Sequence, residues 1–140
     1  MGANIELGKR IAAWCCILAI GILSLLPAVE VAPMRTSLGG HVEHLLTYTA
    51  AGFITAVAYL DQSRLKIAAW LVLYAAVLEF LQRYAPGRLS RLEDLAFSTA
   101  GIVLGVTGFH LLQHLRVAAG VASRLRGCRN CRIRRSSLKR

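Results

Sequence analysis

Four long apolar stretches follow one another along the chain, separated by short segments that contain polar residues, proline and glycine. They cover residues 11–29, 44–59, 65–84 and 93–115, and the first of them carries no charged residue. A helix needs roughly 20 mainly apolar residues to cross the hydrocarbon core of a bilayer. The pattern therefore predicts an all-α, polytopic membrane protein built as a four-transmembrane-helix bundle.

Helix-breaking and helix-capping residues stand at the ends of these stretches. Pro27 ends the first one, and Pro86-Gly87 ends the third, because proline disfavours helix in the preceding residue and glycine allows a turn. The pattern Ser90-x-x-Glu93 is that of a capping box, which predicts the start of the fourth helix.

The second stretch is the shortest, and it is somewhat polar. It contains Thr47, Thr49 and Thr55, so we expect it to face other helices as much as lipid. If this stretch entered the bilayer and returned, three crossings would remain and the C-terminus would lie on the opposite side.

Basic residues set the predicted orientation. Thirteen of the 17 Lys and Arg residues fall before the first stretch, after the fourth, or at the connection between the second and third, where Arg64 and Lys66 lie, and the other four fall in the two remaining connections. Cytoplasmic loops carry the excess of Lys and Arg in membrane proteins. We therefore expect both termini to be cytoplasmic and the connections 30–43 and 83–94 to face outward. An uncleaved first helix is expected, because no small-x-small cleavage site follows it.

The C-terminal segment differs from the rest of the chain. Nine basic residues lie between Arg116 and Arg140, which raises the formal charge to +10. The sequence predicts a membrane domain over residues 1–115 and a mobile, basic cytoplasmic tail over 116–140 that contacts anionic lipid. No nucleic-acid partner is expected, since no recognition motif accompanies the basic residues.

Cysteine gives little indication of function. Cys15 and Cys16 lie inside an apolar stretch, where cysteine behaves as a small hydrophobic residue. Cys128 and Cys131 form a single CxxC pair, whereas a structural zinc site takes four ligands. We therefore expect no metal and no cofactor.

Polar residues near the two outward connections suggest a site. His44 and Tyr48 are four residues apart and Glu79 and Gln82 are three apart, so each pair shares a helix face. Arg88 lies in the following turn and Asp94 begins the fourth helix. The candidate site residues are His44, Tyr48, Glu79, Gln82, Arg88 and Asp94.

Glu79 is the most informative of them. A carboxylate inside the membrane costs about 2.5–3.5 kcal/mol on insertion scales and marks a functional candidate, with Arg88 and His44 as the expected partners. Structural explanations remain open: an ion pair that locks the bundle, an interhelical hydrogen bond by Gln82, or an acid that favours a helix N-terminus at Asp94. Gly101 and Gly105 form a GxxxG pair, which predicts close helix packing or, alternatively, a homo-oligomer.

Taken together, these motifs resemble those of the VanZ-like family. The resemblance covers residues 39–108 and rests on His44-x-x-x-Tyr48, Glu79-x-x-Gln82, Pro86-Gly87-Arg88, Asp94 and the GxxxG pair. Family members often have Asp-Lys before the histidine and an Asn in the fourth helix, where this chain has Gly40-His41 and Ser98. The resemblance implies a protein of the bacterial cytoplasmic (inner) membrane, linked through the founding member to glycopeptide antibiotic tolerance.

Three functional hypotheses follow. The first is an envelope protein whose outward polar pocket binds the anionic head group of a lipid or cell-wall precursor, with Arg88 as the phosphate contact. The second is a membrane-embedded enzyme acting on a lipid-linked phosphate, with Glu79 or Asp94 as general base and His44 as general acid. The third is a non-catalytic membrane scaffold.

Overall fold

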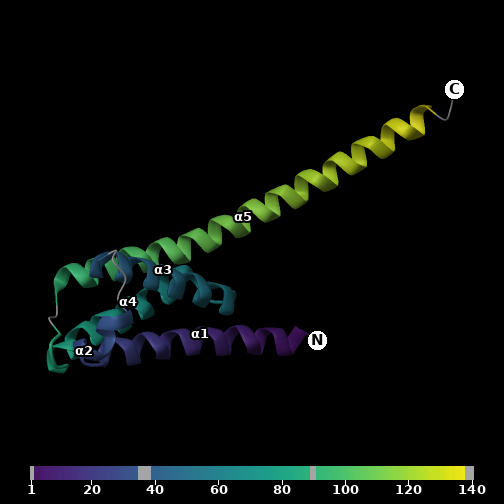
Figure 1. Ribbon diagram of the computed structural model, residues 1–140. Helices are drawn as coiled ribbons and strands as arrows, with labels where there is room; N and C mark the ends of the chain where they lie inside the picture. The colour runs from purple at the N-terminus through teal and green to yellow at the C-terminus, as the bar shows by residue number, and fades with distance from the viewer. Residues whose placement is uncertain (1, 35–38, 89–90, 138–140) are drawn as a thin grey trace. The chain divides into compact units, whose positions relative to one another are not determined.

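The computed structural model describes residues 2–34, 39–88 and 91–137, with side chains described as far as residue 120. Its elements are α1 (Gly2–Leu25), α2 (Ala28–Val31), the 3₁₀ turn η1 (Ala32–Met34), α3 (Gly40–Ala58), α4 (Arg64–Leu81), the 3₁₀ turn η2 (Gln82–Tyr84) and α5 (Leu92–Ser137). Figure 1 shows α1, α3 and α4 packed beside one another. The described part of the chain is helical and contains no strand, which confirms the all-α prediction.

The chain divides into two compact units, Met1–Phe109 and His110–Arg140. The first unit holds α1 to α4 and the beginning of α5, and the site described below lies within it. The predicted Ser90 cap lies outside the described residues, as do the side chains of Cys128, Cys131 and most of the basic tail. The backbone of α5 continues through residue 137, so the segment 116–137 is helical.

Three helical segments are long and apolar enough to cross a membrane: Ala3–Leu25, Arg64–Tyr84 and Leu92–Gly120. They correspond to the first, third and fourth predicted spans. Helix α3 falls short of this measure, because its first two turns carry His41, Glu43 and His44.

Large apolar side chains cover the outside of these helices. Ile22, Leu65 and Leu73 are each more than 60% exposed. Exposed apolar surface on this scale is unusual for a soluble monomer and suits a surface in contact with lipid. The core holds smaller residues and a few large ones, of which Leu71, Ile102 and Val106 are almost completely buried.

Glycines bring α3 and α5 into close contact. A Cβ atom added to Gly101 would collide with the backbone oxygen of Leu45, and one added to Gly105 would collide with that of Thr49. Gly52 of α3 approaches the backbone of Ile102 in the same way. The predicted close-packing role of the GxxxG pair is thus confirmed within one chain. Since Gly101 meets Leu45 and Gly105 meets Thr49, the two helices run in the same direction.

Helices α1 and α4 also run in the same direction, whereas α1 and α3 run in opposite directions. Trp70 of α4 packs against Trp14 of α1, and one turn later the Tyr74 hydroxyl donates to the Ile17 carbonyl at 2.6 Å. Midway along α1, the Trp14 indole N–H donates at 3.0 Å to the hydroxyl of Tyr59, which follows the last residue of α3. Helix α3 therefore extends along α1 toward the N-terminal end of α1.

The turns that end α1 at Pro27 and follow α4 at Gly87 lie side by side, at the C-terminal end of α1. The Ala28 N–H donates to the Pro86 carbonyl at 3.1 Å, and Gly87 has a φ of 73°. A Cβ at residue 87 would lie 3.2 Å from the Ala28 side chain. Glycine suits this position because L side chains rarely adopt positive φ. The turn predicted at Pro86-Gly87 is thus confirmed.

Candidate functional site

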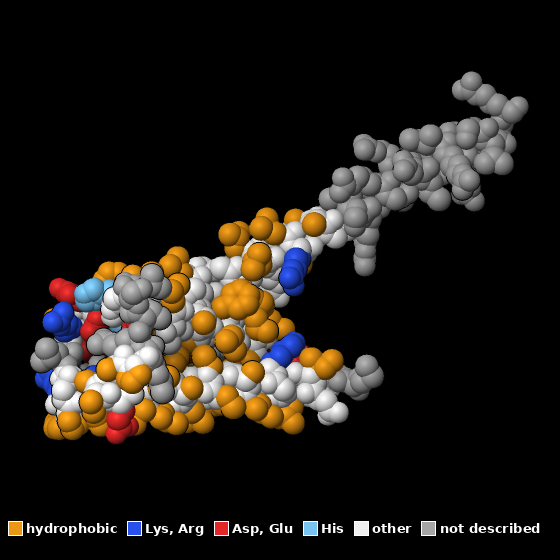
Figure 2. Space-filling model, viewed as in Figure 1, with side chains coloured by type: hydrophobic (Ala, Val, Ile, Leu, Met, Phe, Trp, Pro, Cys, Tyr) orange, Lys and Arg blue, Asp and Glu red, His pale blue; other side chains and the backbone are white. Residues whose placement is uncertain are grey.

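Charged and polar side chains gather at the end of the bundle where the α1–α3 and α4–α5 connections lie. Figure 2 shows acidic, basic and histidine side chains at this end, and mainly apolar side chains over the remainder of the first unit. The loop-end cluster is defined by side chains from α3, α4, η2 and the first turns of α5: His41, His44, Tyr48, Glu79, Gln82, Glu93, Asp94 and Ser98.

His41 is held by the first turn of α5. Its Nδ1 lies 2.9 Å from Oδ1 of Asp94, and its Nε2 lies 3.4 Å from Oε2 of Glu93. An ionised carboxylate accepts hydrogen bonds and cannot donate them, so Nδ1 of His41 carries the proton toward Asp94. The ring also stacks on Phe97, with 5.0 Å between centroids.

The second histidine of α3 is held in a similar way one turn further along. Nδ1 of His44 lies 3.1 Å from Oγ of Ser98, and that hydroxyl donates to the Asp94 backbone carbonyl at 2.8 Å. Because the hydroxyl has one proton, it accepts from His44, whose Nδ1 is therefore protonated. This direction of hydrogen bonding differs from that of a serine nucleophile activated by a histidine base.

Tyr48 lies one turn after His44 on the same face of α3, and its side chain is buried. The two rings are nearly parallel, with 6.3 Å between centroids and 14° between planes. The phenol is also close enough to Glu79 of α4 for electrostatic interaction. Tyr48 thus lies between His44 of the same helix and the Glu79 side of α4.

Glu79 is 7% exposed, so its carboxylate is enclosed by the bundle. Oε1 of Glu79 accepts the backbone N–H of Arg91 at 2.5 Å. The turn at Gly87 reverses the chain, and Arg91, immediately before α5, returns over the end of α4. The sequence predicted Arg88 and His44 as partners, whereas the described partner is a backbone amide that no side-chain pattern indicates.

Arg88 contacts the end of α1. Its guanidinium donates from Nη2 to the Leu23 carbonyl at 2.7 Å and from Nε to the Leu26 carbonyl at 3.3 Å. The last carbonyls of a helix have no partner within the helix, and an arginine can satisfy them. Arg88 therefore fastens the α4–α5 turn to α1. Gln82, the other predicted site residue, is buried in η2 directly after α4.

The structure adds members to the cluster that sequence reasoning missed, chiefly His41, Glu93 and Ser98. His41 and His44 are three residues apart, a spacing that puts both on one helix face and could have indicated the first of them. Within the described residues, no group of three or more His, Cys, Asp and Glu side chains is arranged to hold a metal ion.

The cluster contains two imidazoles, and the orientation of each is fixed by a hydrogen bond between its Nδ1 and a residue of α5. Asp94 and Ser98 hold the two Nδ1 atoms, so Nε2 of His44 is the ring nitrogen available to a further partner, whereas Nε2 of His41 already lies 3.4 Å from the Glu93 carboxylate. A protonated Nε2 donates a hydrogen bond to an anionic oxygen, and a neutral one accepts a proton. The cluster therefore combines the chemistry of anion binding with that of proton transfer.

Comparison with protein-family models matches residues 10–113 of the chain to VanZ/LLP1. Neither the comparison with curated proteins nor that with solved structures gave a match. The matched segment runs from residue 10 within α1 through α4 and includes the part of α5 that carries Asp94 and Ser98.

Proposed function

The chain belongs to the VanZ/LLP1 family, and from this membership we propose an envelope function for it. In this proposal it is a multi-pass protein of the bacterial cytoplasmic membrane, whose loop-end cluster faces outward. There it binds the anionic head group of a lipid or of a cell-wall precursor, and through this binding it contributes to glycopeptide tolerance.

Four membrane crossings are supported by the way α3 packs. Its 19 residues give a length of about 28 Å at 1.5 Å per residue, close to the ~30 Å of a hydrocarbon core. At one end it contacts Asp94 through His41, and at the other it is followed by Tyr59, which contacts Trp14. Its polar N-terminal turns face α5 rather than lipid, which would explain how a helix of modest hydropathy crosses. The excess of basic residues outside the two connections near the cluster supports a cluster that faces outward.

The observation that carries the head-group proposal is the pair of imidazoles on α3. Both are anchored through Nδ1 to α5, by Asp94 and Ser98, so neither ring needs to be ordered when a ligand arrives. Donors that are already oriented lose less conformational entropy on binding. A protonated Nε2 of His44 would donate a charge-assisted hydrogen bond to a phosphate oxygen, and Nε2 of His41 would do so in place of its 3.4 Å contact with the Glu93 carboxylate.

Arg88 has two roles in this proposal, one structural and one electrostatic. Arg88 contacts α1 carbonyls, so its first contribution is to hold the cluster's turn in place. The phosphate contact that the sequence predicted for Arg88 remains part of the proposal, as one of the outward basic groups that raise the local concentration of anions.

A second candidate function rests on His41 and Asp94. A carboxylate that fixes the tautomer of an imidazole is the arrangement that general acid–base catalysis uses. A membrane-embedded enzyme acting on a lipid-linked phosphate is therefore the alternative, with His44 as general acid and Asp94 or Glu79 as general base.

The test compares two substitutions of His44 by native mass spectrometry of the purified protein with phosphatidylglycerol or a polyprenyl phosphate. His44→Asn keeps a donor near the Nδ1 position and removes Nε2, whereas His44→Gln places its amide nearer the Nε2 position. We expect His44→Asn to bind about 10-fold or more weakly, the size of a charge-assisted hydrogen bond, and His44→Gln to bind more tightly than His44→Asn.

His114→Asn provides the matched control, because His114 is an exposed histidine outside the cluster. If a folded His44→Asn protein retained both lipids as well as the wild-type protein does, the head-group proposal would be contradicted. Conversion of the polyprenyl phosphate to a product by the wild-type protein, lost in His44→Asn, would establish the enzyme instead.

A further inference from the structure

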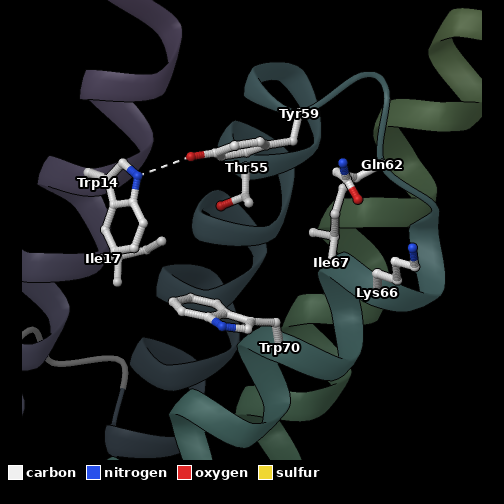
Figure 3. Close-up of a pocket in the computed structure, with 8 residues that line it drawn as sticks. All are labelled: Trp14, Ile17, Thr55, Tyr59, Gln62, Lys66, Ile67 and Trp70. Carbon is white, nitrogen blue, oxygen red and sulfur yellow. Dashed lines mark hydrogen bonds between the residues drawn. The ribbon is translucent and has the colours of Figure 1, made fainter.

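A cavity of about 330 Å³ opens at the other end of the bundle, away from the loop-end cluster. It lies among α1, α3 and α4 and the α3–α4 connection, as Figure 3 shows. The residues around it are mainly apolar and aromatic: Trp14, Ile17, Thr55, Tyr59, Gln62, Lys66, Ile67 and Trp70. Both tryptophans of the chain belong to this set.

The wall of the cavity contains a polar group that needs a partner. Thr55 is 7% exposed, and its hydroxyl oxygen is buried without a hydrogen-bond partner. In Figure 3 this oxygen points toward the side of the cavity where Trp14 and Ile17 lie. A buried hydroxyl without a hydrogen-bond partner destabilises a fold, so such groups usually have one. A ligand with an acceptor oxygen would supply the missing hydrogen bond.

The mouth of the cavity is basic. Lys66 lines it and belongs to the first turn of α4, which contains no acidic residue and begins with Arg64. Cations at the N-terminus of a helix are unfavourable, because the backbone N–H groups already give that end a partial positive charge. The nearby carboxylate, Asp61, accepts from Gln62 at 3.3 Å in the same connection. An anion at this mouth would be favoured both by Lys66 and by the end of α4.

The aromatic groups define what can occupy the remainder of the cavity. Trp14 and Trp70 meet edge to face with 5.9 Å between centroids, and Arg10 lies 5.5 Å from the Tyr59 ring centroid. Tryptophan and tyrosine prefer the membrane interface, where one end of the side chain is apolar and the other contacts polar groups. A volume of 330 Å³ is at the lower limit for ligand pockets, so it accommodates part of a lipid.

We propose that this cavity is a second site, which binds an anionic phospholipid of the adjacent leaflet. The phosphate lies at Lys66 and the start of α4, an ester carbonyl accepts the Thr55 hydroxyl, and the first part of an acyl chain packs against Trp14 and Trp70. The remainder of the lipid stays in the bilayer. This site is separate from the loop-end cluster and does not depend on the function proposed for it.

The test is competition between phosphatidylglycerol and phosphatidylcholine for the detergent-purified full chain, followed by native mass spectrometry. Thr55→Val is nearly isosteric and removes the hydroxyl, so we expect about 2- to 10-fold weaker retention of lipid, the size of one hydrogen bond. Lys66→Gln should lower the preference for phosphatidylglycerol and leave phosphatidylcholine unchanged.

Two control variants match these changes. Thr107→Val removes an exposed threonine hydroxyl that bonds to its own helix, and Lys9→Gln removes a basic group that pairs with Glu6 outside the cavity. Neither should alter lipid retention. Without lipid, Thr55→Val should melt at the wild-type temperature or higher, because the hydroxyl then has no partner to lose.

Tryptophan fluorescence gives an independent measurement. Phosphatidylglycerol with brominated acyl chains should quench Trp14 and Trp70 in micelles, and less so in Lys66→Gln. Equal retention of the two lipids by the wild-type protein would overturn the anionic assignment. Wild-type retention and quenching in both Thr55→Val and Lys66→Gln would overturn the site.

Discussion

The carboxylate of Glu79 and the backbone N–H of Arg91 are joined by a 2.5 Å hydrogen bond across the α4–α5 turn. The partner is a backbone group, so any residue except proline at position 91 preserves the bond. Glu79 is therefore positioned by the fold of the turn.

The first prediction separates the hydrogen bond of Glu79 from its charge. The amide of Glu79→Gln can still accept from Arg91, so the variant should remain folded and lose antibiotic tolerance. Glu79→Leu removes the acceptor of the Arg91 N–H and should lower the free energy of unfolding by about 1–3 kcal/mol. Melting in detergent and antibiotic tolerance are measured for both variants.

Glu6→Gln is the control, because Glu6 is exposed and contacts Lys9 at the N-terminal end of α1. Normal tolerance in a folded Glu79→Gln protein would contradict a functional role for the charge. A Glu79→Leu protein as stable as the wild type would show that the bond to Arg91 contributes little.

The second prediction concerns Arg88 and the end of α1. Arg88→Gln removes the donors to the Leu23 and Leu26 carbonyls and should destabilise the protein by about 1–3 kcal/mol. Arg83→Gln is the matched control, since Arg83 is exposed and contacts the Phe80 ring. Thermal unfolding of both variants provides the measurement. Equal stability of the two would mean that the guanidinium contacts with α1 are not structural.

The helices could be predicted from the sequence because long apolar stretches leave few alternatives to a membrane helix. The residues at which the helices begin were less predictable. The second span was expected from residue 44, whereas α3 begins at Gly40, since the polar residues His41 and Glu43 lie within the helix. Similarly, α1 begins at Gly2, well before the predicted residue 11, although Glu6 and Lys9 are charged. Hydropathy does not indicate that a charged turn continues a helix.

The site was predictable only where its members share a helix. His44 with Tyr48, and Glu79 with Gln82, follow from helical spacing, and the structure keeps each pair on one side of the bundle. The contact between His41 and Asp94 joins residues 53 positions apart. It depends on α3 and α5 running in the same direction at a distance set by Gly101, which a single sequence does not specify.

The third prediction concerns membrane topology. If α3 crosses the membrane, reporter fusions after Arg64 and at Arg140 should both be cytoplasmic, and one at Gly39 should be outside. The basis is the basic excess at one end and the alternating directions of α1, α3, α4 and α5. Opposite locations for the fusions at Arg64 and Arg140 would contradict four crossings and favour a second stretch that enters and returns.

The last prediction uses the glycines of α5. A methyl group at residue 101 or 105 would collide with the α3 backbone, at Leu45 and Thr49 respectively. Because backbone cannot move aside as a flexible side chain does, Gly101→Ala and Gly105→Ala should each cost about 1–3 kcal/mol or more.

Gly108 offers a control on the same helix. A Cβ at residue 108 meets nothing within 4 Å, so Gly108→Ala should be neutral or stabilise the helix by up to about 1 kcal/mol. Unfolding by a denaturing detergent, followed by circular dichroism, compares the three variants. Since α3 of the same chain covers Gly101 and Gly105, their substitution should separate α3 from α5 and weaken the His41–Asp94 contact. It should therefore reduce head-group binding together with stability. If Gly105→Ala instead keeps the stability of the chain and abolishes a homo-oligomer, the GxxxG pair serves association between copies and the packing of α3 against α5 does not depend on it.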